Sequence, residues 1–251
     1  MHQTDHSLLE KMNIQSDAIV INQCDRNEIE YFSFNGHDIL WMSLNERGIG
    51  LSRNTALMRA NADIVLFADD DVRYVDGYPQ MVLSTFEKNP KADFLLVDLE
   101  SIGDVRRINK PFEFRRIRWY NSMHYGAVHF ACKRESILAK SLSFSLLFGG
   151  GARYGSGEDN IFLAGALKSG MKVWSVPGYI GTVKCGASTW FKGYTDKYFF
   201  DKGILMGTIW GVKAYPLMIA LLLKNRNQTK NYGLFNAIRK SFEGIRHRSG
   251  W

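Results

Sequence analysis

Three consecutive aspartates, Asp69, Asp70 and Asp71, stand at the end of a short apolar run. Residues 64–67 of that run are β-branched or aromatic, which predicts a buried central strand. Carboxylates crowded at the end of a strand repel one another, and a divalent cation would relieve the repulsion. Oxygen ligands suit Mg²⁺ or Mn²⁺, so the aspartates are a candidate metal site. The alternative is a solvated acidic turn, because Asp is common in turns.

A second acidic pair, Glu158 and Asp159, follows a glycine-rich loop at residues 149–157 and precedes a predicted helix at 160–169. Glycines allow a backbone to approach a ligand closely, so this loop and the acidic pair are candidates for a binding site. The helix dipole alone also favours acidic residues at a helix start. Both interpretations stay open at this point.

Arg53 and Asn54 are expected in the first turn of a helix that begins near Ser52, a good N-cap residue. A helix N-terminus that carries an arginine is a ready site for an anion such as phosphate. The alternative for Arg53 is a solvated surface side chain.

The elements that would position these residues alternate along the chain. Strand, helix and strand in this order, joined by short links, indicate an α/β protein with a largely parallel sheet. Ligands bind such sheets at the carboxyl ends of the strands, where the aspartates lie. The predicted strands are 17–23, 39–44, 64–67, 94–98, 127–132 and 171–176, and the predicted helices include 5–13 and 78–89, with a polar loop and an Asn35-Gly36 turn after the first strand.

The composition limits the class of partner. The 251 residues carry a formal net charge of +7, which favours anionic partners such as nucleic acid, a membrane surface or a phosphorylated molecule. A basic segment at residues 104–118 suits a nucleic-acid surface, a phosphorylated acceptor or a solvated loop. Three widely spaced cysteines show no paired framework, and His129 with Cys132 lacks the other half of a zinc site. The polar N-terminus predicts no signal peptide.

The chain divides into a main domain at 1–190 and a helical, basic extension at 191–251. Residues 203–223 of the extension are largely apolar and long enough to span a bilayer. Lys213 and Pro216 argue against a span, since a lysine at the membrane centre costs roughly 2.5–3.5 kcal/mol. A helix lying on an anionic membrane surface fits better, and ordinary burial against the domain is the alternative.

The ordered motifs resemble those of an inverting family 2 glycosyltransferase. They are Gly-Leu-Ser-Arg-Asn at 50–54, Phe-Ala-Asp-Asp-Asp at 67–71 and Gly-Glu-Asp-Asn at 157–160, and the resemblance covers roughly residues 14–185. It implies the GT-A fold, a Rossmann-like and mostly parallel sheet flanked by helices. It also implies transfer of a sugar from a nucleoside diphosphate sugar.

The resemblance implies roles for the donor side of the site. Asp69 would contact the nucleotide and, with Asp71, hold Mn²⁺ or Mg²⁺ on the diphosphate, while Asp70 supports them. Arg53 and Asn54 would lie near the nucleotide or its phosphates.

The resemblance also implies the catalytic residues. Asp159 would be the general base that deprotonates the acceptor hydroxyl, and Glu158 would help to hold the acceptor. The base then acts on the attacking hydroxyl, and the metal acts on the leaving nucleoside diphosphate.

Two departures from the family pattern affect the nucleotide pocket. The family opens with an apolar strand, whereas residues 1–5 are polar, so that first strand is expected to be missing here. In the segment 22–25, Asp25 is the candidate acid for the nucleotide.

The sequence thus predicts a metal-dependent glycosyltransferase of bacterial surface polysaccharide synthesis. Its acceptor would be a glycan or a lipid-linked intermediate, and it would sit peripherally on the cytoplasmic face of the plasma membrane, without nucleic acid as a partner. The alternatives are a sugar nucleotidyltransferase, for which no phosphate loop is found near the first strand, an inactive transferase-like scaffold, and a nucleic-acid binder that would leave the acidic motifs unused.

Overall fold

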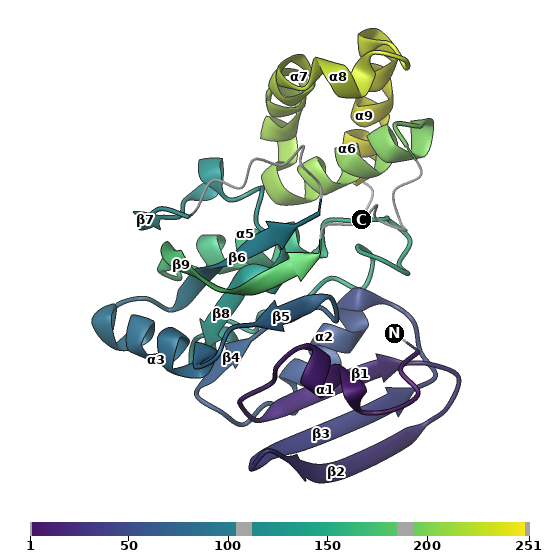
Figure 1. Ribbon diagram of the computed structural model, residues 1–251. Coiled ribbons are helices and arrows are strands. Elements are labelled where there is room, and N and C mark those ends of the chain that lie inside the picture. Colours follow the sequence, from purple (N-terminus) through teal and green to yellow (C-terminus); the bar gives the residue numbers. More distant parts are fainter. Residues whose placement is uncertain (1, 104–111, 185–192, 249–251) are drawn as a thin grey trace.

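The computed structural model describes residues 2–103, 112–184 and 193–248. They form two β-sheets with helices around them and a helical group at the C-terminal end (Figure 1). Much of the predicted basic segment lies outside the described residues, because Arg106, Arg107 and Lys110 fall within 104–111. Cys185 lies outside them as well.

The first sheet has three strands in the order β1-β3-β2. β1 (Ala18–Gln23) runs parallel to β3 (His37–Leu44), and β2 (Glu28–Phe34) runs antiparallel to β3. Asn35 and Gly36, with φ of 51° and 82°, form the tight turn of the β2–β3 hairpin, as predicted. The polar loop predicted before this turn is wrong, because β2 occupies it. The exposed face of β2 carries Ile29 and Tyr31, so the strand shows no simple polar and apolar alternation.

The second sheet has six strands, five of them in the order β4-β8-β6-β9-β5. In the described residues, β6 with β9 is its parallel pair and the other pairings are antiparallel. The strands are β4 (Ile64–Leu66), β5 (Val72–Tyr74), β6 (Phe94–Ile102), β7 (Arg115–Arg116), β8 (Phe130–Lys133) and β9 (Val173–Lys184). The short strand β7 lies outside the order given above and pairs with β9.

The prediction of a largely parallel sheet is therefore wrong: both sheets are mixed. The helix α2 (Ile49–Leu57) connects β3 to β4, but these two strands belong to different sheets, so this crossover does not make them parallel neighbours. The prediction that residues 64–67 form a central buried strand is also wrong. β4 is an edge strand and only partly buried.

The buried centre of the second sheet is β6. Its alternate side chains enter two different apolar clusters, with Leu95 and Val97 in one and Phe94 and Leu96 in the other. The first cluster also contains Trp41 of β3, so it joins the two sheets. The remaining helices of this part are α1 (Ser7–Lys11), α3 (Tyr78–Lys88), α4 (Arg134–Ala139) and α5 (Glu158–Lys168).

β1 and β4 are edge strands of separate sheets, and within the described residues no strand joins them. The missing first strand expected from the family pattern stays a prediction.

The C-terminal helices are α6 (Asp196–Trp210), α7 (Ala214–Lys224), α8 (Arg226–Thr229) and α9 (Leu234–Arg248). The backbones of α6 and α9 cross closely, since a Cβ on Gly203 would collide with the backbone of Ser241. α6 also packs against the preceding part of the chain in an apolar cluster that includes Phe148, Tyr154 and Leu205. By length and composition, residues 196–224 are one helical stretch that could cross a membrane, and 39% of its most apolar window is buried.

Candidate active site

Arg53 joins the three motifs that the sequence sets far apart. Its Nη1 donates to Glu158 Oε1 at 2.8 Å, and its Nη2 donates to Asp69 Oδ1 at 2.8 Å. The guanidinium is nearly buried, with 8% of the residue exposed. Burial by itself would lower the pKa of Arg53, but the carboxylates of Asp69 and Glu158 outweigh it and raise that pKa.

The helix that carries Arg53 begins earlier than predicted. α2 starts at Ile49, with Gly48 at φ 128° as its N-cap, and Ser52 lies inside it and donates from its hydroxyl to the Ile49 carbonyl. The N-cap prediction at Ser52 is therefore wrong, because the chain already turns into the helix at a glycine. Arg53 and Asn54 consequently lie beyond the first turn, and Arg53 points to carboxylates.

Asn54 is held by backbone. Its amide nitrogen donates to the Phe144 carbonyl at 2.9 Å, and its amide oxygen accepts from the Phe144 N–H at 2.8 Å. These bonds favour a structural role, in which Asn54 fixes the loop before the glycine-rich segment against α2. Its predicted contact with the donor stays a prediction.

The glycine-rich loop packs on α2 and on the acidic pair. Gly150 accepts a hydrogen bond from the Ile49 N–H at 3.0 Å, which satisfies a free donor at the start of α2. Gly149 has φ of +104°, and a Cβ there would lie 2.6 Å from Ile49 Cγ2 and 2.7 Å from Glu158 Oε2. At Gly149 the close approach is thus to side chains of the protein itself, Ile49 of α2 and Glu158 of α5.

Asp159 follows Glu158 in the first turn of α5. Burial, and then the neighbouring Glu158 carboxylate, raise the pKa of Asp159 from 3.8 to about 6. Its Oδ1 accepts from the Asn160 N–H at 2.7 Å, and a Cβ on Gly126 would lie 3.4 Å from its Oδ2. A carboxyl with this pKa is ionised at neutral pH and can still take up a proton, as a general base must.

The three aspartates lie in the segment between β4 and β5. Asp69 is half-buried against Arg53, while Asp70 and Asp71 are exposed. Partial loss of hydration, followed by the charges of Asp69 and Asp70, raises the pKa of Asp71. A bound cation would offset the repulsion between these carboxylates, and their oxygens are ligands that suit Mg²⁺ or Mn²⁺.

Within the described ranges, no three His, Cys, Asp or Glu side chains form a complete metal cluster. The predicted metal site at Asp69 and Asp71 stays a prediction.

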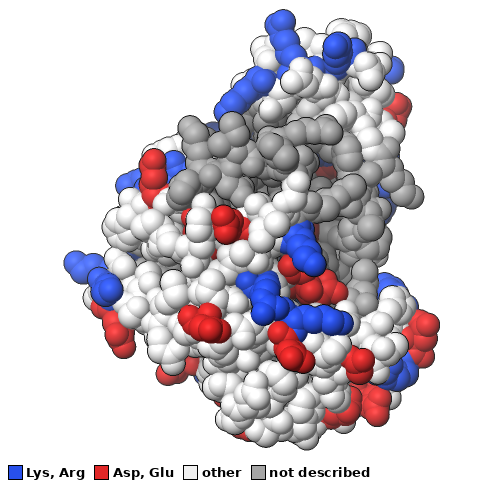
Figure 2. All heavy atoms as spheres, in the orientation of Figure 1, with Lys and Arg blue, Asp and Glu red and all other residues white. Residues whose placement is uncertain are grey.

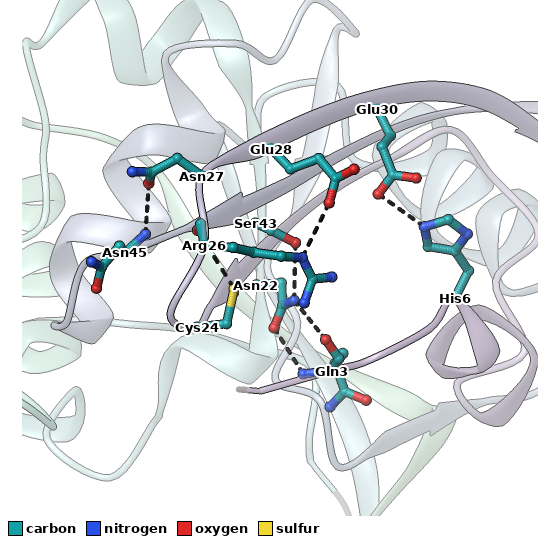
Figure 3. Close-up of polar contacts among 10 residues, drawn as sticks. All are labelled: Gln3, His6, Asn22, Cys24, Arg26, Asn27, Glu28, Glu30, Ser43 and Asn45. Carbon is teal, nitrogen blue, oxygen red and sulfur yellow. Dashed lines mark hydrogen bonds and ion pairs between the residues drawn. The ribbon is translucent and has the colours of Figure 1, made fainter.

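Asp25 lies at a separate corner, after the carboxyl end of β1. It is mostly exposed and pairs with Arg47, whose Nη2 donates to its Oδ1 at 2.9 Å. Close by, the Asn22 amide donates to Ser43 and to the Gln3 carbonyl, which ties β1 to β3 and to the N-terminal segment (Figure 3). The contact of Asp25 with the nucleotide stays a prediction.

The carboxyl end of β1, near Asp25, is linked to the start of α2. Gln23 exchanges two hydrogen bonds with the Gly48 backbone, at 3.1 Å and 3.3 Å. The end of β1 therefore supports the start of the helix that carries Arg53.

Sequence reasoning missed two groups near the site. For His129 the sequence shows only an incomplete zinc pattern. In the structure its Nδ1 donates to the Val97 carbonyl at 2.9 Å, burial lowers its pKa, and Asp69 opposes this shift. Asp98, in the middle of β6, accepts from the Phe112 N–H at 2.7 Å, and burial raises its pKa. A lone histidine and an aspartate inside an apolar strand show no spacing pattern, so only their neighbours reveal them.

Residues 4–147 match the model of Glycosyl transferase family 2, a segment that includes Arg53 and the three aspartates and ends before Glu158. No curated protein sequence matches the chain.

Similar solved structures include S. aureus TarS 1–349. Its TM-score is 0.64 at 12% sequence identity, and the alignment covers 96% of this chain and 76% of that one. TarS 1–349 in complex with UDP-GlcNAc gives a TM-score of 0.59 at 13% identity, with coverage of 92% and 69%. These likenesses establish the fold, and the predicted GT-A fold is confirmed. Since the family model matches more than half of the sequence, the chain belongs to glycosyl transferase family 2 and is a glycosyltransferase.

Proposed function

We propose that this glycosyltransferase moves a sugar from a nucleoside diphosphate sugar to a hydroxyl of a glycan or a lipid-linked acceptor. The observation that carries the proposal is the Arg53 bridge, which holds Asp69 and Glu158 on one guanidinium at 2.8 Å each. It fixes the acidic loop before β5 against the start of α5. Arg53 would then hold in fixed relative positions the residues that act on the leaving group and those that act on the nucleophile.

Asp159 acts as the base in this proposal. It takes the proton from the acceptor hydroxyl while the oxygen attacks the anomeric carbon and the bond to the nucleoside diphosphate breaks. With a pKa raised to about 6, this carboxyl is still ionised at neutral pH, and its carboxylate is a better proton acceptor than that of an ordinary aspartate. Glu158 is engaged by Arg53, so its role is to position Asp159 and the acceptor side of the site.

Asp69 and Asp71 are the residues that would hold a divalent cation. When bound, Mn²⁺ or Mg²⁺ would neutralise the charge that develops on the leaving nucleoside diphosphate. Asp69 keeps one oxygen on Arg53, so its other oxygen is the one available for the cation. TarS has been solved with UDP and with UDP-GlcNAc, which supports a nucleotide-sugar donor for this chain as well.

The C-terminal helices supply the proposed membrane contact, on the cytoplasmic face of a bacterial plasma membrane. Exposed apolar side chains on and beside α7 and α9 include Val212, Ile219, Leu223 and Phe235. Lys and Arg side chains gather on the same end of the molecule, at the top of Figure 2 where α7 and α8 lie. Apolar groups flanked by basic ones suit the interface of an anionic membrane, where a transferase would meet a lipid-linked acceptor of surface polysaccharide synthesis.

Calorimetric titration tests the donor site. UDP, GDP, CDP and dTDP are titrated into the full chain with and without Mn²⁺. One nucleotide should bind in a metal-dependent way, and Asp71→Asn should lose that binding. Asp63→Asn is the matched control, because Asp63 is exposed at the other end of β4. If no nucleotide binds to the folded wild-type protein, an inactive scaffold replaces the proposal.

A further inference from the structure

Residues 118–126 lie beside the proposed base, and neither the sequence motifs nor the proposed mechanism uses them. Near the end of this segment, the Met123 carbonyl accepts from the Asn160 side-chain amide at 3.4 Å. A Cβ on Gly126 would lie 3.4 Å from Asp159 Oδ2. Asp159 Oδ1 accepts from the Asn160 N–H, so Oδ2 is the oxygen that the segment flanks. A hydroxyl that approaches Oδ2 therefore has this segment on one side.

The start of the same segment presents two large aromatic side chains to solvent. Trp119 is 59% exposed and Tyr120 is 64% exposed. Their rings lie at 88° to each other, with centroids 5.6 Å apart. Leaving this much ring surface in water is unfavourable, and Trp and Tyr are enriched where proteins bind other molecules. The aromatic pair Trp119 and Tyr120 is therefore a candidate contact for a ligand.

Hydrogen bonds fix the backbone that carries the aromatic pair. Both residues belong to the short helical turn η1 (Trp119–Asn121). The Arg118 N–H donates to the side-chain oxygen of Asn121 at 2.7 Å, and the Ser122 hydroxyl donates to the Trp119 carbonyl at 3.2 Å. Ser122 is itself buried. The two rings are thus held out from an anchored turn, which lowers the entropy lost when a ligand binds them.

The chain limits the distance between the aromatic pair and the base. Ser122, which is bonded to the Trp119 carbonyl, directly precedes Met123, whose carbonyl contacts α5. The four residues from Trp119 to Met123 span at most about 14 Å when fully extended, and the turn shortens this span. An acceptor that holds one hydroxyl at Asp159 can therefore extend as far as Trp119.

A sugar ring suits this surface better than a lipid chain. One face of a pyranose presents C–H groups with a slight positive charge, whereas the face of an aromatic ring is negative. The hydroxyls of a sugar also need polar partners, and the exposed residues Arg118 and His124 lie close to the pair in the same segment. An acyl chain would need a continuous apolar surface in place of these polar residues.

We propose that Trp119 and Tyr120 form an acceptor subsite, on which one sugar ring of the acceptor stacks while its reacting hydroxyl reaches Asp159. This inference rests on the proposed function and names the acceptor as a glycan, with a sugar ring close to the attacking hydroxyl. Open-chain polyols lack the flat C–H face and would lose this contact.

The test uses the full chain labelled with fluorotryptophan and followed by ¹⁹F NMR, in the presence of Mg²⁺ and the nucleoside diphosphate that binds best. Trp119→Phe identifies the Trp119 signal by its loss. The probes are the disaccharides cellobiose, maltose, N,N′-diacetylchitobiose and mannobiose, and the open-chain polyol sorbitol is the control. We expect a saturable shift of the Trp119 signal with at least one disaccharide and none with sorbitol. If no disaccharide shifts the signal, the inference is wrong.

Two further variants measure the contribution of the aromatic pair by calorimetry. Trp119→Ala combined with Tyr120→Ala should weaken binding of the disaccharide by about tenfold and leave nucleotide binding unchanged. Tyr31→Ala is the matched control, because Tyr31 is an equally accessible aromatic residue on β2, and it should leave disaccharide binding unchanged. Equal losses in the two proteins would contradict a specific subsite.

Trp and Tyr also occur at membrane–water interfaces, so vesicles of phosphatidylglycerol are added in a parallel titration. A Trp119 signal that responds to the vesicles and to no disaccharide would assign the aromatic pair to the membrane contact and overturn the inference. Absence of nucleotide binding in the wild-type protein would instead contradict the proposed function.

Discussion

Arg53 and Glu158 lie 2.8 Å apart, although 105 positions separate them in the chain. Both side chains are almost fully buried, and the second arm of the guanidinium holds Asp69. A fork of donors that pairs with two carboxylates is a geometry that arginine can make and lysine cannot. This pair therefore sets the relative position of α2, α5 and the acidic loop.

Removal of the Arg53 side chain should destabilise the protein strongly. Arg53→Ala leaves the Glu158 carboxylate buried without its partner, and breaking a buried pair in this way costs about 3–5 kcal/mol. Urea unfolding measures the difference. Arg26→Ala, which breaks the exposed pair with Glu28, is the control and should change the free energy of unfolding by no more than about 1 kcal/mol. Similar effects of the two variants would contradict a buried bridge.

The transfer rate should depend on pH through Asp159. A general base must be ionised, so kcat/KM should fall about tenfold per pH unit as the pH drops below the Asp159 pKa of about 6, and it should level off above it. The pH profile of transfer measures this. Asp159→Asn should remove the activity while nucleotide binding remains. A profile without this acidic limb would exclude Asp159 as the base.

The same carboxyl should lower stability at neutral pH. Its folded pKa, about 6, lies above its ordinary value of 3.8, so the folded state binds the proton more tightly than the unfolded state does. The free energy of unfolding then falls as pH rises through this interval, and the loss is complete above about pH 6.

Asp159→Asn should therefore stabilise the folded protein at neutral pH, by on the order of 2 kcal/mol. Glu158→Gln, one residue earlier, should do the opposite, because it weakens the pair with Arg53. Thermal unfolding of both variants at neutral and at acidic pH distinguishes them. If Asp159→Asn were less stable than the wild type at neutral pH, the ionised carboxylate of Asp159 would not be destabilising the folded protein.

Gly149 should tolerate no side chain. Its φ of +104° and the short distances from a Cβ to Ile49 and Glu158 predict a loss of about 1–3 kcal/mol in Gly149→Ala, together with weaker catalysis, since Glu158 must move. Gly155→Ala is the matched control in the same loop, because nothing lies within 4 Å of a Cβ there. Unfolding and transfer rates are measured for both, and equal behaviour would contradict the close packing.

The membrane contact should depend on the exposed apolar residues of the C-terminal helices. Val212→Asp combined with Phe235→Asp should reduce sedimentation of the protein with vesicles of phosphatidylglycerol and phosphatidylcholine. Tyr31→Asp on β2 is the control, because Tyr31 and Phe235 are each 79% exposed. Sedimentation that both changes leave intact, or that occurs equally with phosphatidylcholine alone, would contradict an anionic membrane surface.

Local sequence accounted for much of the fold. The Asn35-Gly36 turn, the strands at β1, β3 and β6 and the helices α3 and α5 follow from turn residues and apolar periodicity. The strand β2 was missed, since it carries Ile29 and Tyr31 on its exposed face. The mixed pairing was missed as well, because strand direction depends on which sheet a strand joins after a crossover.

The sequence by itself determined the family, since residues 4–147, which include Arg53 and the three aspartates, match the family model. Only the tertiary structure decided which groups these residues contact. It showed Arg53 bound to the carboxylates of Asp69 and Glu158, and Asn54 bound to the Phe144 backbone. The reason is physical: burial and pairing depend on distances between segments that are remote in the chain, and no local pattern of residues encodes them.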